Sequence, residues 1–190
     1  MKITMKTLVV ATLCLLLSTH SHSQKLENQI KPLRVGQRLP EIILNKIHNY
    51  KATRYALSDM DFKLMIIQLW SSKAVEYTAE YQTLENLEWV NNYNVQFLKV
   101  TPETESKILS SLLIDPPPSP SWIPLVTDDR VFTKLFPQVK STQYIWIDRK
   151  RKIIAITNSY AITEENINLA LENKPIEIPT LASSKNTTVQ

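Results

Sequence analysis

A turn rich in small and hydroxyl-bearing side chains follows an apolar run in the first half of the chain. The run reads KLMIIQLW over residues 63–70, and it continues into LWSSKAVEYTAEY over residues 69–81. Trp70, Ser71 and Ser72 therefore stand between a candidate buried strand and a candidate helix. A strand-to-helix turn of this kind is a common place for binding or catalytic residues, because loops on a rigid scaffold carry function.

The composition restricts the chemistry that this turn can perform. Among the 190 residues there is one cysteine, Cys14, and one glycine, Gly36, and His48 is the only histidine beyond position 22. Nucleophilic, acid–base and metal sites usually draw on these residue types. His48 has no partner at metal-ligand spacing, so we expect a surface or loop histidine, no metal site and no cofactor.

The first residues have the three-part plan of a secretory signal peptide. Lys2 and Lys6 precede an apolar run over residues 8–17, and small polar residues follow. The run is short for a membrane span. We predict cleavage after Ser23, export to the periplasm and no cysteine in the mature chain. Lipidation at Cys14 is the alternative, although Leu13 stands where a small residue would be wanted.

The charge pattern argues against a nucleic-acid partner. The formal net charge is +4, and residues 1–23 hold two lysines and no acidic residue, so cleavage lowers it to +2. The remaining basic residues are scattered, except for RKRK at residues 149–152, which resembles a polar hairpin turn. A nucleic-acid-binding domain usually shows a stronger basic patch.

Alternating apolar segments predict one α/β domain with a parallel strand pair. We expect a short strand at residues 41–44, a central strand at 64–70, a helix at 74–91 and a strand at 95–100. The central run is apolar almost throughout, which indicates burial on both faces and a parallel neighbour. Tyr77, Tyr81, Leu84, Leu87 and Val90 follow helical spacing.

The second half predicts a shorter helix, a hairpin and a final helix. The shorter helix ends near residue 113, and the prolines of DPPPSPSWIP exclude a regular element until residue 125. A short helix is expected at residues 131–136, a hairpin of strands 143–148 and 153–157, and a helix at 163–172 that Thr163 opens. We expect domain limits of 1–23 for the signal, 24–34 for a leader, 35–174 for the domain and 175–190 for a disordered tail.

Several blocks in this order resemble the thioredoxin-like superfamily, and within it the secreted TlpA-like thiol-disulfide oxidoreductases. The matching stretches are VGQRLPEIIL, LSDMDFKLMIIQLWSS, VQFLKVT and YIWIDRKRKIIAITNS, and together they extend from about residue 35 to residue 171. The resemblance implies a thioredoxin-like fold, a central mixed β-sheet flanked by helices.

The residues that carry the chemistry of that family are replaced in this chain. The resemblance places the redox motif Cys-x-x-Cys at Ala74, Val75, Glu76 and Tyr77, which follow Trp70, Ser71, Ser72 and Lys73. It also places the family's cis-proline at Thr142, after Ser141. A thiolate is required to attack a disulfide, and a second thiol resolves the intermediate. The resemblance therefore implies a site that has lost its redox chemistry.

We interpret the other aromatic side chains mainly as packing residues. Tyr77 and Tyr81 lie in the apolar stripe, although a ligand role for either remains an alternative. Trp70 and Trp146 end or lie within strands. Trp122, among prolines, either contacts a ligand or anchors a long loop.

We expect a redox-inactive, exported thioredoxin-like domain that binds an unidentified envelope protein or peptide. A concave surface around residues 71–74 and Thr142 is the expected place for an extended peptide, added as a strand. The alternatives are a TlpA-like oxidoreductase, an enzyme with non-cysteine chemistry, or a fragment of a longer redoxin-like protein.

Overall fold

The computed structural model describes residues 30–72, 84, 86–87, 94–114, 122–137 and 142–177, with side chains omitted at 111–114. The chain divides into two compact units, Met1–Pro32 and Leu33–Gln190. The fold described below is that of the second unit. It begins with Leu33, whose N–H donates to the carbonyl of Leu135 at 2.9 Å.

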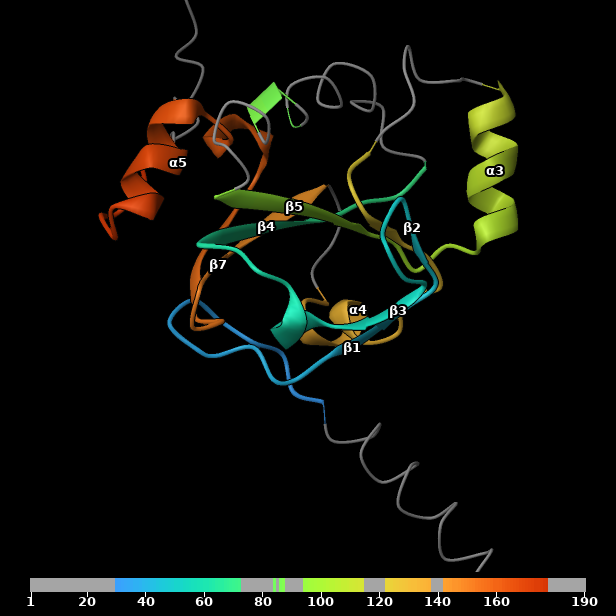
Figure 1. Cartoon of the computed structure of the whole chain (residues 1–190), viewed down its shortest axis with the longest axis horizontal. Helices are drawn as coiled ribbons and strands as arrows, with labels where there is room; N and C mark the ends of the chain where they lie inside the picture. The colour runs from blue at the N-terminus through green and yellow to red at the C-terminus, as the bar shows by residue number, and fades with distance from the viewer. Residues whose placement is uncertain are drawn as a thin grey trace, which may run out of the picture. The chain divides into compact units, whose positions relative to one another are not determined.

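A six-stranded mixed sheet forms the centre of this second unit (Figure 1), in the order β2-β6-β5-β4-β7-β8. Its central strand β4 (Leu64–Leu69) is parallel to β5 (Val95–Val100) and antiparallel to β7 (Gln143–Asp148). All six residues of β4 are buried. Burial on both faces, which the apolar run predicted, is confirmed together with the parallel neighbour.

The outer strands close the two edges of this sheet. β7 forms a hairpin with β8 (Ile153–Thr157), and their register shifts between Trp146 and Ile147. At the other edge, β6 (Leu125–Val126) is parallel to β5, and β2 (Ile47–His48) is antiparallel to β6. The predicted hairpin and its turn at residues 149–152 are confirmed.

Two apolar layers pack against the sheet. On one face, Ile66, Phe97 and Trp146 form a cluster with buried residues of α5 (Glu164–Leu171) and with Leu84. On the other face lie a small sheet of β1 (Ile43–Asn45) and β3 (Arg54–Ala56), the 3-10 helix η1 (Leu57–Asp59), and α4 (Phe132–Leu135).

The helices follow local capping chemistry. Thr163 precedes α5, and its Oγ1 accepts a hydrogen bond from the N–H of Asn166 at 3.2 Å, as the sequence predicted. Asp129 accepts three N–H groups at the start of α4, from Val131, Phe132 and Thr133. The helix α3 (Glu105–Ile114) and the 3-10 helix η2 (Ser159–Ala161) complete the described elements.

Two expectations for the first strands are corrected. The strand predicted at residues 41–44 is β1, which spans Ile43–Asn45. The Leu57 N–H donates to the Ile42 carbonyl at 2.9 Å in the same register, but β3 ends at Ala56, where the chain enters η1. His48 lies in strand β2, not in a loop. Its Nε2 is 3.1 Å from Thr127 Oγ1, and its side chain is half-buried. Strand pairing with β6, distant in sequence, is the reason.

The buried indole of Trp146 generates a test of this core. Its Nε1–H donates to Thr157 Oγ1 at 2.9 Å, and the Trp146 side chain is fully buried. Thr157→Val keeps the side-chain volume but leaves the indole N–H without an acceptor. We expect the free energy of unfolding to fall by about 1–3 kcal/mol, measured by urea denaturation. The exposed Thr53→Val is the control and should change it by less than about 0.5 kcal/mol; equal losses in both variants would contradict the assignment.

Candidate functional site

Three chain segments meet at the end of the sheet where β4 stops. The register places Leu69 of β4 opposite Val100 of β5 and opposite Gln143 of β7. The residues that follow β4 and β5 and the residue that precedes β7 therefore lie at the same edge. In open α/β sheets, this carboxyl edge of the parallel strands is the usual place for ligands.

Trp70 directly follows the last residue of the central strand, Leu69, and begins the path of the chain into the turn. Trp70 is 6% exposed, and its backbone N–H donates to the Val100 carbonyl at 3.1 Å. The predicted position of Trp70 at the end of the strand is thus confirmed. Ser71 and Ser72 follow it and are half-buried.

A glutamate that the sequence reasoning did not select holds this turn. Glu103, which follows β5, accepts a hydrogen bond from Ser71 Oγ on Oε1 at 2.9 Å and one from the Ser72 N–H on Oε2 at 3.0 Å. Lys107 Nζ donates to Oε1 at 2.6 Å. The Glu103 side chain is 9% exposed. We call these four residues, Ser71, Ser72, Glu103 and Lys107, the serine clamp.

The contacts of the serine clamp keep the Glu103 carboxylate ionised. Burial acts to raise its pKa, but the hydrogen bonds from Lys107, Ser72 and Ser71 outweigh it and lower the pKa to about 2. A general base works best with a pKa near the operating pH. Glu103 is therefore a poor base for activating Ser71, and the clamp acts as a positioning device for the turn.

A buried polar row lies in the sheet beneath the turn. Gln68 pairs across the register with Lys99 on one side and with Tyr144 on the other. Gln68 Nε2 donates to the Tyr144 hydroxyl at 2.9 Å, and Lys99 is 5% exposed. Buried polar groups in a sheet favour one register over its alternatives, because a one-residue slip would place them on the other face.

The structure places five of the predicted site residues. Trp70, Ser71 and Ser72 lie at the β4 end, and Thr142, which is 8% exposed, directly precedes β7 at the same edge. Trp122 stands three residues before β6 and is 57% exposed, whereas the adjacent Ile123 is fully buried. The other predicted site residues lie outside the described part of the chain: Lys73, Ala74, Val75, Glu76, Tyr77, Tyr81 and Ser141.

Two further results concern metals and membranes. Within the described ranges, no group of three or more His, Cys, Asp or Glu side chains is arranged to hold a metal ion. The helices in the same ranges are too short or too polar to cross a membrane. The nearest acidic partner of His48 is Glu105, whose Oε1 is 3.8 Å from His48 Nδ1.

One pattern in the sequence could have identified Glu103. It stands in TPETESK, three residues beyond a buried strand that is parallel to β4. Polar residues that follow neighbouring parallel strands gather at one edge of a sheet. The sequence does not show which of Glu103 and Glu105 turns toward Ser71, because that depends on the backbone path after Val100.

The pKa of Glu103 generates a prediction about pH. Because the folded pKa lies below the unfolded value, the clamp stabilises the fold above about pH 4.5, and this contribution is lost as pH falls toward about 2. We expect Glu103→Gln to lower the free energy of unfolding at pH 7 by about 1–3 kcal/mol, measured by urea denaturation.

The pH dependence separates this role from a simple loss of packing. The difference between wild type and Glu103→Gln should shrink steadily between about pH 4.5 and pH 2. The exposed Glu165→Gln on α5 is the control and should follow the wild type throughout. A difference for Glu103→Gln that is constant with pH would contradict the ionised clamp.

Comparisons with known proteins give the fold but no close relative. No family model matches the chain, and no curated protein matches it. Among solved structures, a chain named thiol:disulfide interchange protein DsbE from Chlorobium tepidum matches with a TM-score of 0.58 and 17% identity, over 73% of this chain and 99% of that chain.

Two further solved structures agree. A chain named as a thioredoxin from Neisseria meningitidis matches with a TM-score of 0.56 and 14% identity, over 74% of this chain and 93% of its own. A chain named as a protein disulfide isomerase from Bacteroides thetaiotaomicron matches with a TM-score of 0.54 and 20% identity, over 74% and 87%. At these identities the likeness concerns the fold alone, and the chain has a thioredoxin-like fold.

Proposed function

We propose that this chain is an exported thioredoxin-like binding module that performs no dithiol chemistry. The observation that carries the proposal is the chemistry of the turn after β4. Where the resemblance places two cysteines, the chain has Ala74 and Tyr77, and its one cysteine is Cys14. Disulfide exchange requires a thiolate, and no residue type in this turn supplies one.

The serine clamp supports a binding role over an enzymatic one. Both Glu103 oxygens are already engaged by Ser71, Ser72 and Lys107, so the carboxylate is committed to holding the backbone. A rigid turn at the carboxyl edge of a sheet offers a preorganised surface, which lowers the entropic cost of binding.

The partner that fits this edge is an extended peptide. Ser71 and Ser72 on one side and Thr142 on the other flank the end of β4, and Gln143 begins strand β7 beside them. Main-chain groups near Thr142 can pair with a peptide backbone, and neighbouring side chains then select its sequence. Export to the periplasm belongs to the same proposal and depends on the predicted signal peptide.

The alternative, a thioredoxin-like oxidoreductase, is tested directly with the chain from residue 24 onward. In an insulin-reduction assay with dithiothreitol, we expect the rate to equal that of the uncatalysed reaction. Turnover above this background would overturn the redox-inactive assignment.

A repair experiment tests whether several parts of the redox site have been lost. Ala74→Cys with Tyr77→Cys should form a disulfide, because residues three apart on a helix are neighbours. It should nevertheless reduce insulin slowly, since Glu76 opposes the thiolate and Tyr77→Cys removes a large side chain that we place in the core.

Adding Glu76→Pro and Thr142→Pro to this double variant should raise the rate of insulin reduction well above that of the double variant. Proline is tolerated in the first helical turn, and position 142 then carries the residue that the resemblance implies. Thermal melting checks that all variants remain folded. A double variant as fast as an ordinary thioredoxin would show that only the cysteines were missing.

Peptide binding is tested with heptapeptides selected from a random phage-displayed library. A selected peptide, synthesised and titrated, should shift the amide resonances of Ser71, Ser72 and Gln143. Ser72→Arg places a long charged side chain on this surface and should weaken binding by roughly tenfold or more, a loss of about 1.4 kcal/mol. Ser110→Arg on α3 is the matched control. Equal weakening by both variants, or no selected peptide that shifts these amides, would contradict the peptide surface.

A further inference from the structure

A polar cleft lies at the opposite end of the sheet from the serine clamp. It has a volume of about 460 Å³ and is lined by polar and charged residues together with parts of Leu57, Met60 and Phe62. The register pairs Leu64, the first residue of β4, with Asp148, and the turn at residues 149–152 follows directly. The length of β4, roughly 17–20 Å for a strand of this size, separates the cleft from Ser71 and Ser72.

One wall of the cleft is basic and rigid. The carboxylate of Asp148 accepts the N–H of Lys150 at 2.8 Å and that of Lys152 at 2.9 Å, which fixes the hairpin turn. Arg38 pairs with Lys152 as an isolated antiparallel bridge, and the Leu39 N–H donates to the Arg151 carbonyl at 2.8 Å. These backbone contacts bring Arg38 beside Arg149 and Arg151, although more than 100 residues separate them in sequence.

The other wall is acidic and equally anchored. Leu57, Met60 and Phe62 are buried, so the intervening Ser58, Asp59 and Asp61 face outward. This alternation presents two carboxylates to the cleft on a segment that its apolar neighbours hold in place.

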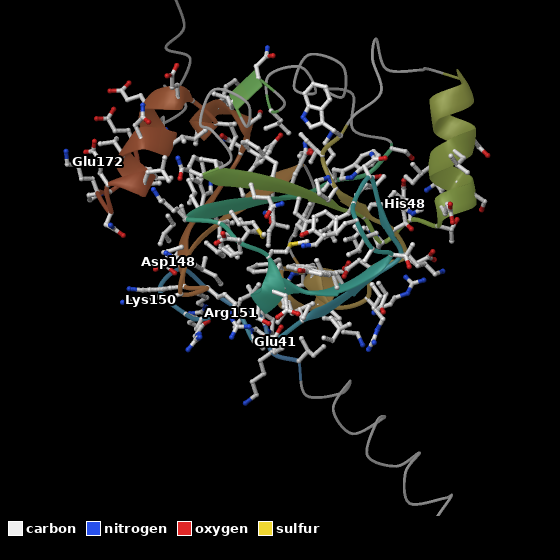
Figure 2. The ribbon with its side chains drawn as sticks, in the orientation of Figure 1. Glu41, His48, Asp148, Lys150, Arg151 and Glu172 are labelled. Carbon is white, nitrogen blue, oxygen red and sulfur yellow. The ribbon has the colours of Figure 1, made fainter. Side chains whose placement is uncertain are left out.

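Glu41 connects the two walls. Its Oε1 accepts the Ser58 N–H at 3.3 Å, and its Oε2 forms an ion pair with Arg151. Figure 2 shows Glu41 and Arg151 together, with Asp148 and Lys150 on the same side of the sheet. Arg151 is therefore engaged within the wall, and Arg38 and Arg149 remain as the guanidinium groups available to a ligand.

The charges across the cleft do not satisfy one another. Among the described residues, no carboxylate oxygen lies within 4.0 Å of Arg38 or Arg149, and no basic nitrogen lies that close to Asp61, although all three line the cleft. Asp59 receives a hydrogen bond from Ser58 Oγ at 3.3 Å and lies in the field of Lys51. Asp61 is thus the principal open carboxylate.

We propose that this cleft binds a small dipolar ligand, with an oxyanion on Arg38 and Arg149 and an ammonium group facing Asp61. Guanidinium groups recognise carboxylates and phosphates through paired N–H donors. A plain anion would meet the repulsion of the acidic wall, and a plain cation that of the basic wall. A ligand with both charges satisfies each wall, and the cleft volume is within the range of small-molecule sites.

Three small probes test the charge requirement by isothermal titration of the chain from residue 24 onward. O-phosphoethanolamine carries both groups, inorganic phosphate carries the oxyanion alone, and ethanolamine carries the ammonium alone. We expect O-phosphoethanolamine to bind roughly two- to fivefold more tightly than phosphate, because one exposed ion pair changes the affinity by about this factor. We expect ethanolamine not to bind. Both affinities should fall with added salt. Phosphate binding as tight as that of O-phosphoethanolamine, or no binding of any probe, would overturn the proposal.

Variants assign the two walls. Arg38→Gln combined with Arg149→Gln should abolish binding of O-phosphoethanolamine and of phosphate. The control is Arg54→Gln with Arg130→Gln, which removes the same charge from residues outside the lining of this cleft. It should leave the binding of both probes unchanged. Asp61→Asn should remove the preference for O-phosphoethanolamine over phosphate. Equal effects of the two double variants would show that net charge alone explains binding. An unchanged preference in Asp61→Asn would show that Asp61 does not face the ammonium group. Either result would overturn the proposal. All four substituted arginines and Asp61 are exposed, so thermal melting should confirm intact folding.

A vesicle experiment distinguishes a lipid headgroup from a soluble ligand as the source of the phosphate and ammonium groups. Flotation with vesicles of phosphatidylethanolamine mixed into phosphatidylcholine, compared with phosphatidylcholine alone, tests a lipid headgroup. Co-flotation with the first and not the second, lost in Arg38→Gln with Arg149→Gln, would assign the headgroup. Binding of free O-phosphoethanolamine without co-flotation would assign a soluble ligand.

Discussion

The burial of β4 on both faces is the constraint on which the rest of the structure depends. Its six residues lie between β5 and β7 and have layers of side chains above and below them. A strand in this position must be apolar and can be paired in only one register, since a slip would exchange its two faces. The single polar residue of the strand, Gln68, has a buried partner in Tyr144, so its amide N–H donor is satisfied.

The two ends of this strand have different chemical characters. At its carboxyl end, Glu103 accepts hydrogen bonds from Ser71 and Ser72 and holds a turn whose side chains are small. At its amino end, a charged hairpin, η1 and the segment that follows η1 line a polar cleft. Both regions obtain their rigidity from acidic side chains that accept backbone N–H groups, Glu103 in the first, and Asp148 and Glu41 in the second.

A thioredoxin-like fold does not by itself specify thioredoxin chemistry, because function depends on the site that the fold carries. The neighbours with solved structures share the arrangement of strands at 14 to 20% identity. In this chain the edge at the end of β4 has a half-buried, ionised glutamate, Glu103, and two serines. At this edge Glu103 holds the two serines in place, and its lowered pKa makes it a poor general base.

The sequence by itself determined the elements whose burial is visible in a local pattern. Four elements were predicted: the runs at residues 64–70 and 95–100, the hairpin around residues 149–152 and the capped helix after Thr163. The spacing of apolar residues and the capping residues that predict them are set by residues close together in the sequence. That Cys14 is the one cysteine among the 190 residues is likewise a property of the sequence. The tertiary structure alone decided that Glu103 reaches Ser71, that His48 lies in a strand beside Thr127, and that Glu41 links Ser58 to Arg151. Each of these contacts joins residues between 17 and 110 positions apart, and strand register and chain path bring them together. No local pattern records that geometry, because it arises only when the sheet has formed.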